Sequence, residues 1–146
     1  MSQVEDFLTD QEEQFIVDAI IQAERNSSGE IRVHIEEHTI KQPFERAQEV
    51  FQFLQMDQTK NRNGVLFYVG VSDHSFVILG DKGINEKVEA GFWDQTKDVV
   101  VEHFKKGQYK DGLVKGVLKA GLKLQQLFPY DEDSDADELP NEISRG

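Results

Sequence analysis

The sequence predicts one α/β domain, a small mixed β-sheet of three or four strands sandwiched between helices, in the order α-β-α-β-β-α-α. Three observations support this class. Residues 31–36 alternate apolar and polar side chains, as a strand does. Two short apolar runs, 65–69 and 76–79, are typical of buried strands. Apolar residues at helical spacing precede and follow these strands.

The first half of the chain is predicted to contain two helices around one strand. Thr9 and Glu12 have capping-box spacing, so we expect a helix over about 10–25. The alternating strand at 31–36 should bury one of its two faces. Pro43 suits the first position of the next helix. That helix carries an apolar stripe at Phe44, Ala47, Phe51 and Leu54.

The second half is predicted to form a β-hairpin followed by two helices. Residues 72–74 suit a turn, so the strands at 65–69 and 76–79 should be antiparallel. The helical crossover before them should make the first two strands of the chain parallel. Apolar stripes then predict helices over about 92–104 and 113–128.

The acidic charge divides the chain into an α/β domain, residues 1–128, and a tail, residues 129–146. The formal net charge of the 146 residues is −12, and half of it lies in the tail, which we expect to be disordered. An acidic chain repels phosphate backbones, so we expect no nucleic-acid partner. The sequence lacks Cys, which excludes disulfides and thiolate metal sites.

The N-terminal residues show no targeting signal. The stretch MSQVEDFLTDQEEQF has neither a basic start nor an apolar run. No apolar run in the chain reaches membrane-spanning length. We therefore expect a soluble, cytoplasmic protein without membrane insertion.

Four short motifs along the chain are similar to those of a known family. They are Ser28-Gly29-Glu30-Ile31-Arg32-Val33, Asn63-Gly64-Val65-Leu66, Ile78-Leu79-Gly80-Asp81-Lys82-Gly83-Ile84 and Phe104-x-x-Gly107-x-Tyr109-x-x-Gly112-Leu113. Over roughly residues 4–128 the chain resembles the TPM domain family, as a stand-alone domain. The resemblance implies calcium binding and acid phosphatase activity, as attributed to a plant thylakoid lumen member. It also implies a protein partner, as for an animal member that assists acetylcholine receptors.

Three predicted loops should meet at one end of the sheet, given the parallel first pair of strands and the antiparallel third strand. They bring together the oxygen-bearing side chains of Ser28, Glu30, Asn61, Asn63 and Asp81. Hard cations prefer such an all-oxygen shell. We therefore predict a Ca²⁺ or Mg²⁺ site whose ligands are Asp81, Glu30, Ser28 and Asn63. The simpler alternative is that Asp81 caps a helix and that the others shape turns.

The opposite end of the sheet is a second candidate. Ligands of open α/β sheets bind outside the carboxyl ends of the parallel strands, which here points to Glu36, Glu37, His38 and Asp73. Histidine together with carboxylates suits zinc or another transition metal. The alternative interpretation of this end is a solvated charged edge.

Two further motifs match metal sites by spacing alone. Residues 34–38 read His-x-x-Glu-His, which requires a helix, whereas on a strand the two histidines lie about 13 Å apart. The aspartates of Asp131–Asp137 imitate an EF-hand loop, but Ala136 replaces the required glycine and Pro140 obstructs a following helix. We expect neither motif to bind a metal.

The sequence thus favours a TPM domain that binds Ca²⁺ or Mg²⁺ as a binding or regulatory module. The first alternative is a metal-dependent acid phosphatase in which Arg62 or Lys82 binds phosphate. Its catalytic residues cannot be named, because no general base is identified and enzymatic activity is implied by the resemblance alone. The second alternative is a protein-interaction domain without a metal.

Overall fold

The structure, a computed structural model, describes residues 7–25, 27–37, 41–129 and 143–145. Its elements follow the predicted order, with a short helix, a 3₁₀ turn and a fourth strand in addition. They are α2 (Asp10–Glu24), β1 (Glu30–Glu36), α3 (Pro43–Phe53), η1 (Met56–Gln58), β2 (Gly64–Gly70), β3 (Ser75–Gly80), α4 (Lys82–Asn85), α5 (Phe92–Lys105), α6 (Tyr109–Leu127) and β4 (Ser144–Arg145). The predicted α/β class is confirmed.

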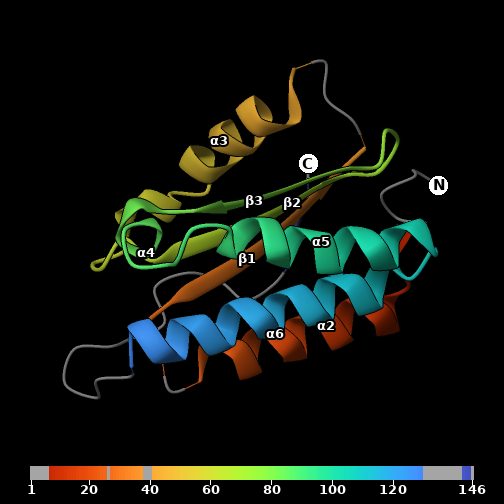
Figure 1. Ribbon diagram of the computed structural model, residues 1–146. Helices are drawn as coiled ribbons and strands as arrows, with labels where there is room; N and C mark the ends of the chain where they lie inside the picture. Colours follow the sequence, from red (N-terminus) through yellow and green to blue (C-terminus); the bar gives the residue numbers. More distant parts are fainter. Residues whose placement is uncertain (1–6, 26, 38–40, 130–142, 146) are drawn as a thin grey trace.

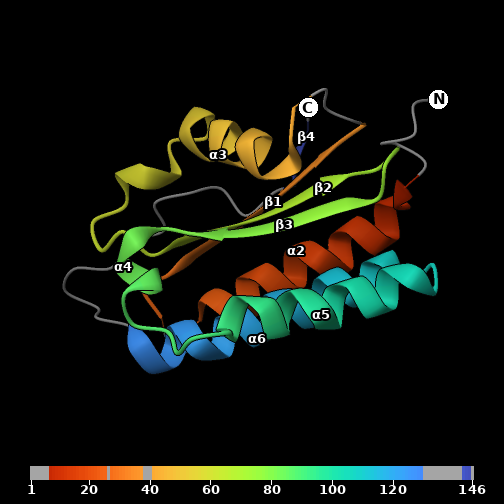
Figure 2. The same ribbon diagram turned by 45° about the horizontal axis from the view of Figure 1, so that its top comes forward.

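The strands form one mixed sheet in the order β3-β2-β1-β4. β1 is parallel to β2, with Glu30 opposite Gly64, and β3 is antiparallel to β2. β4 adds parallel to the other edge of β1. Helix α3 covers one face of the sheet, and α2, α5 and α6 form a layer on the other face (Figures 1 and 2). The starts of β1 and β2 therefore lie at the same end as the end of β3, as predicted.

The larger core lies between the sheet and the layer of three helices. Side chains of β1 and β2 such as Val33 and Phe67 point into it and meet the apolar stripes of the helices. Helices α2 and α6 approach so closely that a Cβ added to Gly121 would lie 2.4 Å from the Cβ of Ala23. Small residues at this crossing let the two backbones touch.

The face of the sheet toward α3 is only partly apolar. Leu66 and Tyr68 of β2 pack against the helix, beside residues such as Val50. β1 presents polar side chains on this face, and all seven residues of Glu30–Glu36 are buried. The prediction that this strand buries only one face is therefore wrong. The alternation separates the two faces correctly, but the polar face pairs with protein groups instead of water.

The ends of the elements match the sequence signals. The Thr9 hydroxyl accepts from the backbone N–H of Glu12, and the Glu12 carboxylate accepts from that of Thr9, which completes the predicted capping box. Pro43 begins α3.

The sequence does not predict β4, which falls within the expected tail, and residues 130–142 of that tail lie outside the described residues. In the described ranges, no helix is long and apolar enough to cross a membrane.

Candidate functional site

The three predicted loops do meet at one end of the sheet. Ser28 links the first two, because its Oγ accepts hydrogen bonds from the side-chain amides of Asn61 and Asn63, both at 3.2 Å. The third loop fits against the second, since a Cβ added to Gly83 would lie 2.1 Å from the carbonyl oxygen of Asn61. Glycine is needed at this position for the two backbones to make contact.

Asp81 follows β3 as expected, but its carboxylate is already engaged. Arg62 donates from Nε to Oδ2 at 2.7 Å and from Nη2 to Oδ1 at 2.9 Å. Oδ1 also accepts from the backbone N–H of Lys82 at 2.8 Å, so Asp81 is the N-cap of α4. Asp81 is 6% exposed, whereas the Arg62 side chain is 38% exposed. A cation that used this carboxylate would have to displace Arg62.

Asn63 is fully buried at the start of β2, beside Glu30 at the start of β1. Its Nδ2 donates to Ser28, but its Oδ1 has no hydrogen-bond partner within the part of the chain that the structure describes. Burying a polar atom in this state costs about 1–3 kcal/mol. The described residues also contain no group of three or more His, Asp or Glu that could hold a metal. A cation here would therefore rely on hydroxyl, amide and main-chain oxygens as well.

The opposite end of β1 holds a polar cluster, the Glu36 cluster, made of the buried Glu36, His34 and Tyr68 and the partly exposed Arg46. Arg46 of α3 donates from Nε and Nη2 to the two oxygens of Glu36, both at 2.9 Å. The Nε2 of His34 and the hydroxyl of Tyr68 donate to the same carboxylate at 3.0 and 2.5 Å. Nδ1 of His34 lies 3.1 Å from the Ser144 hydroxyl in β4. Since each oxygen of Glu36 accepts two hydrogen bonds, this carboxylate is saturated.

The hydrogen bonds set the protonation states of the Glu36 cluster. Burial by itself raises the pKa of Glu36, but the donors Arg46, Tyr68 and His34 outweigh it and lower the pKa from 4.5 to about 2. Burial lowers the pKa of His34 below its ordinary value of 6.5, and Glu36 offsets this only in part. Burial, with the bond to Glu36, raises the pKa of Tyr68. The cluster therefore holds an ionised Glu36 and a neutral His34 at pH 7.

The remaining residues predicted for this end do not join the Glu36 cluster. Asp73, in the turn before β3, is exposed and accepts from the hydroxyl of Ser75, the first residue of β3. Glu37 is exposed, and His38 lies outside the described residues, as does the EF-hand-like stretch of the tail. Residues 34–36 lie in β1, so the helical geometry that His-x-x-Glu-His requires is absent there. The alternative interpretation of a solvated charged edge agrees with the exposed Glu37 and Asp73 but is wrong for Glu36, which is buried.

Sequence reasoning missed Arg46 and Tyr68 as partners of Glu36. A signal for Arg46 was present, because it lies three residues after Pro43 and four before Val50, on the stripe that faces the sheet. A cation on that stripe predicts a buried carboxylate opposite it. Arg62, considered as a phosphate ligand, instead pairs with Asp81.

The fold, together with the end of the sheet where the three loops meet, defines the class of protein. It is a small α/β domain whose mixed sheet is covered by one helix on one face and by a layer of helices on the other. The chain belongs to the TPM domain family, whose model matches residues 1–122. The family predicted from the four motifs is thus confirmed. No curated protein matches the chain.

Solved structures similar to this chain include the BA42 protein of the psychrophilic bacterium Bizionia argentinensis. It is 55% identical, with 100% of each chain covered and a TM-score of 0.91. The N-terminal domain of a P. gingivalis protein is 20% identical, with 86% of this chain and 82% of that chain covered and a TM-score of 0.71. The N-terminal domain of the cg2496 protein of Corynebacterium glutamicum is 11% identical, with 80% and 74% covered and a TM-score of 0.65. The latter two share the fold alone.

Proposed function

We propose that this TPM domain is a regulatory binding module that takes up Ca²⁺ or Mg²⁺ where its three loops meet. The observation that supports this is the fully buried Oδ1 of Asn63, which accepts no hydrogen bond from the described residues. A hard divalent cation is a fitting partner for a buried amide oxygen among carboxylate and hydroxyl groups. The ligands would be Asn63, Asp81, Glu30 and Ser28.

Uptake of a cation would compete with Arg62 for Asp81. The guanidinium now occupies both oxygens of that carboxylate, so a cation gains the ligand only by opening this ion pair. Arg62 also lines a hollow of about 350 Å³ together with Phe44, Leu79 and Asn85. Release of Arg62 would therefore change a surface beside the site, which is how the cation would regulate a partner.

A residue-resolved NMR titration with CaCl₂ and with MgCl₂ tests the proposal. We expect saturable shifts of the backbone amides of Ser28, Asn63 and Asp81, with a change at the Arg62 Nε–H as its partner is lost. Asp81→Asn should abolish these shifts. Asp73→Asn, which changes an exposed aspartate at the other end of β3, should leave them intact.

Arg62→Gln distinguishes direct competition from a general charge effect. It removes the competing guanidinium, so we expect cation affinity to rise by about fivefold, which corresponds to about 1 kcal/mol. Shifts confined to residues 131–142 would contradict the proposal, because the acidic tail alone would then bind the cation. An Arg62→Gln protein with unchanged affinity would contradict the competition.

A further inference from the structure

The outer edge of β3 is the starting point of a second inference, which does not depend on the cation. β3 is the last strand on its side of the sheet, and the described chain places no strand beyond it. Its six residues, Ser-Phe-Val-Ile-Leu-Gly, include no charge and no proline. Edge strands of natural proteins often carry charged residues or proline, which prevent pairing with another strand. β3 has neither a charged residue nor a proline.

The phase of the β2–β3 ladder shows which backbone groups face outward. Asp81 donates its N–H to the carbonyl of Gly64 at 2.9 Å. Antiparallel strands alternate inward and outward residues, so the N–H and C=O groups of Phe76 and Ile78 point away from β2. The N–H and C=O groups of Gly80 also point away from β2, and its carbonyl accepts a hydrogen bond from the side-chain amide of Asn85 at 2.7 Å. Within the described chain, the stretch of edge without a backbone partner thus centres on Phe76, which is 5% exposed, and Ile78.

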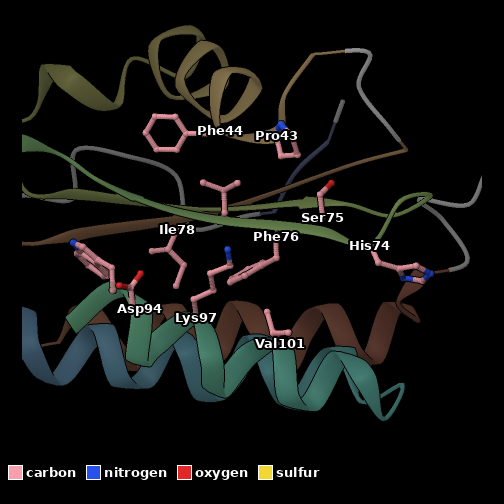
Figure 3. Close-up of a pocket in the computed structure, with 11 residues that line it drawn as sticks. Pro43, Phe44, His74, Ser75, Phe76, Ile78, Asp94, Lys97 and Val101 are labelled. Atoms are coloured by element: carbon pink, nitrogen blue, oxygen red, sulfur yellow. The ribbon is translucent and has the colours of Figure 1, made fainter. Parts of the chain in front are cut away.

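A hollow of about 540 Å³ lies along this stretch. Phe44 on α3 and Val101 on α5 line it from opposite sides (Figure 3). Trp93, also on α5, belongs to the same wall as Val101. Figure 3 shows Lys97 rising from α5 toward the same space. Phe44 is 54% exposed and also lines the smaller hollow near Asp81. The edge therefore lies at the floor of an apolar groove between two helices.

We propose that this groove, the β3 groove, binds an extended segment of a partner protein as an added β-strand. The backbone of the segment would pair with Phe76 and Ile78. Its side chains would alternate between the α3 wall at Phe44 and the α5 wall at Trp93 and Val101, so apolar residues are accepted at consecutive positions.

Charge selects the kind of segment. The lining of the β3 groove itself carries one carboxylate, Asp94, and one ammonium, Lys97, whereas the smaller hollow that shares Phe44 adds the carboxylate of Asp57 beside the mutually paired Asp81 and Arg62. The whole chain carries −12, so a second copy or an acidic segment is repelled. The segment that fits best is therefore apolar in its centre and flanked by lysine or arginine.

Selection from a phage-displayed library of random peptides of about twelve residues, long enough to span β3 with flanks, tests the proposal. We expect enriched peptides with consecutive apolar residues between basic ones. The synthetic peptide should shift the amides of Phe76 and Ile78 in NMR spectra. A version N-methylated at alternate amides should bind about tenfold more weakly or worse, because it cannot form the edge hydrogen bonds.

Two variants on α3 provide a matched pair. Phe44→Ala should weaken peptide binding by about fivefold or more, since the wall of the groove is lost. Phe53→Ala, at an 85% exposed position on the same helix that does not line either hollow, should bind like the original protein. Absence of enrichment, equal binding of the N-methylated peptide, or concentration-dependent self-association that Phe44→Ala abolishes would each overturn the proposal.

Discussion

The two ends of the sheet each hold a buried carboxylate bound through two nitrogens of one arginine, yet the two pairs differ in their surroundings. Glu36 accepts from His34 and Tyr68 as well as from Arg46, which stands on α3. Asp81 accepts from Arg62 and from the backbone of α4. The Glu36 end is a closed network, whereas the Asp81 end depends on a single side chain.

The backbone beneath the two arginines differs as well. Arg46 is held by helical hydrogen bonds, while Arg62 lies in a loop with a left-handed φ of 51° that costs a non-glycine residue energy. Releasing Arg46 would leave the buried Glu36 carboxylate without its cationic partner, although His34 and Tyr68 would still donate to it. Releasing Arg62 frees a half-exposed side chain into water. The ion pair is thus part of a four-residue network at one end, whereas at the other end Asp81 accepts from no second side chain among the described residues.

The largest effect should come from Glu36→Gln. The change keeps the shape but removes the charge that the other three members of the Glu36 cluster share, so we expect a loss of about 3 kcal/mol in the free energy of unfolding. Urea denaturation measures it. Glu49→Gln removes a more exposed carboxylate that also pairs with Arg46 and should change the free energy of unfolding little, because water screens this pair. Equal losses in the two variants would show that the cluster does not act as a closed network.

The second-largest effect should come from acid, which lowers the contribution of Glu36 to the free energy of unfolding. The folded-state pKa of Glu36, about 2, lies below its ordinary 4.5, so its contribution is complete above pH 4.5 and is lost as the pH falls toward 2. The lowered pKa of His34 acts in the same direction, since below pH 6.5 the unfolded chain takes up a proton first. The difference in unfolding free energy between the original protein and Glu36→Gln should therefore shrink between pH 5 and pH 2. A constant difference over this range would contradict the assigned pKa.

Asp81→Asn should have a smaller effect on stability. Asparagine still caps α4, and Arg62 can turn into solvent, so we expect a loss of about 1 kcal/mol in the free energy of unfolding. Asp73→Asn is the matched control and should change it little. A loss for Asp81→Asn as large as that for Glu36→Gln would mean that both ends are rigid structural pairs.

We expect no detectable phosphatase activity. The protein should hydrolyse p-nitrophenyl phosphate no faster than buffer with Mg²⁺ or Ca²⁺ present, because Arg62 is engaged with Asp81 and is therefore not available to bind phosphate. A colorimetric assay at several pH values measures this. Turnover that Asp81→Asn abolishes would overturn the expectation and favour a metal-dependent phosphatase.

Most of the fold could be predicted because local signals and topology agreed. The alternation of β1, the apolar runs of β2 and β3 and the capping box at Thr9 each mark an element within a few residues. The short crossover and the hairpin then fix which strand ends meet. β4 could not be predicted, since two residues paired to a strand more than a hundred positions away leave no periodic pattern.

The candidate sites were less predictable, because a side chain's partners depend on distances that spacing does not encode. The meeting of Ser28, Asn61 and Asn63 followed from topology. The capture of Asp81 by Arg62 did not, since a surface arginine has many accessible conformations. The Glu36 cluster needed a residue from α3, whose rotation over the sheet was not defined by the sequence pattern.

The contact between Gly121 and Ala23 has a consequence for how the chain folds. It joins α2 to α6, the first and last long helices, so each lacks its partner until nearly the whole domain has formed. During that interval Ile16 and Ile20 of α2, both fully buried in the finished fold, remain open to water and to other chains. Expression yield should therefore depend more on this crossing than on either arginine–carboxylate pair.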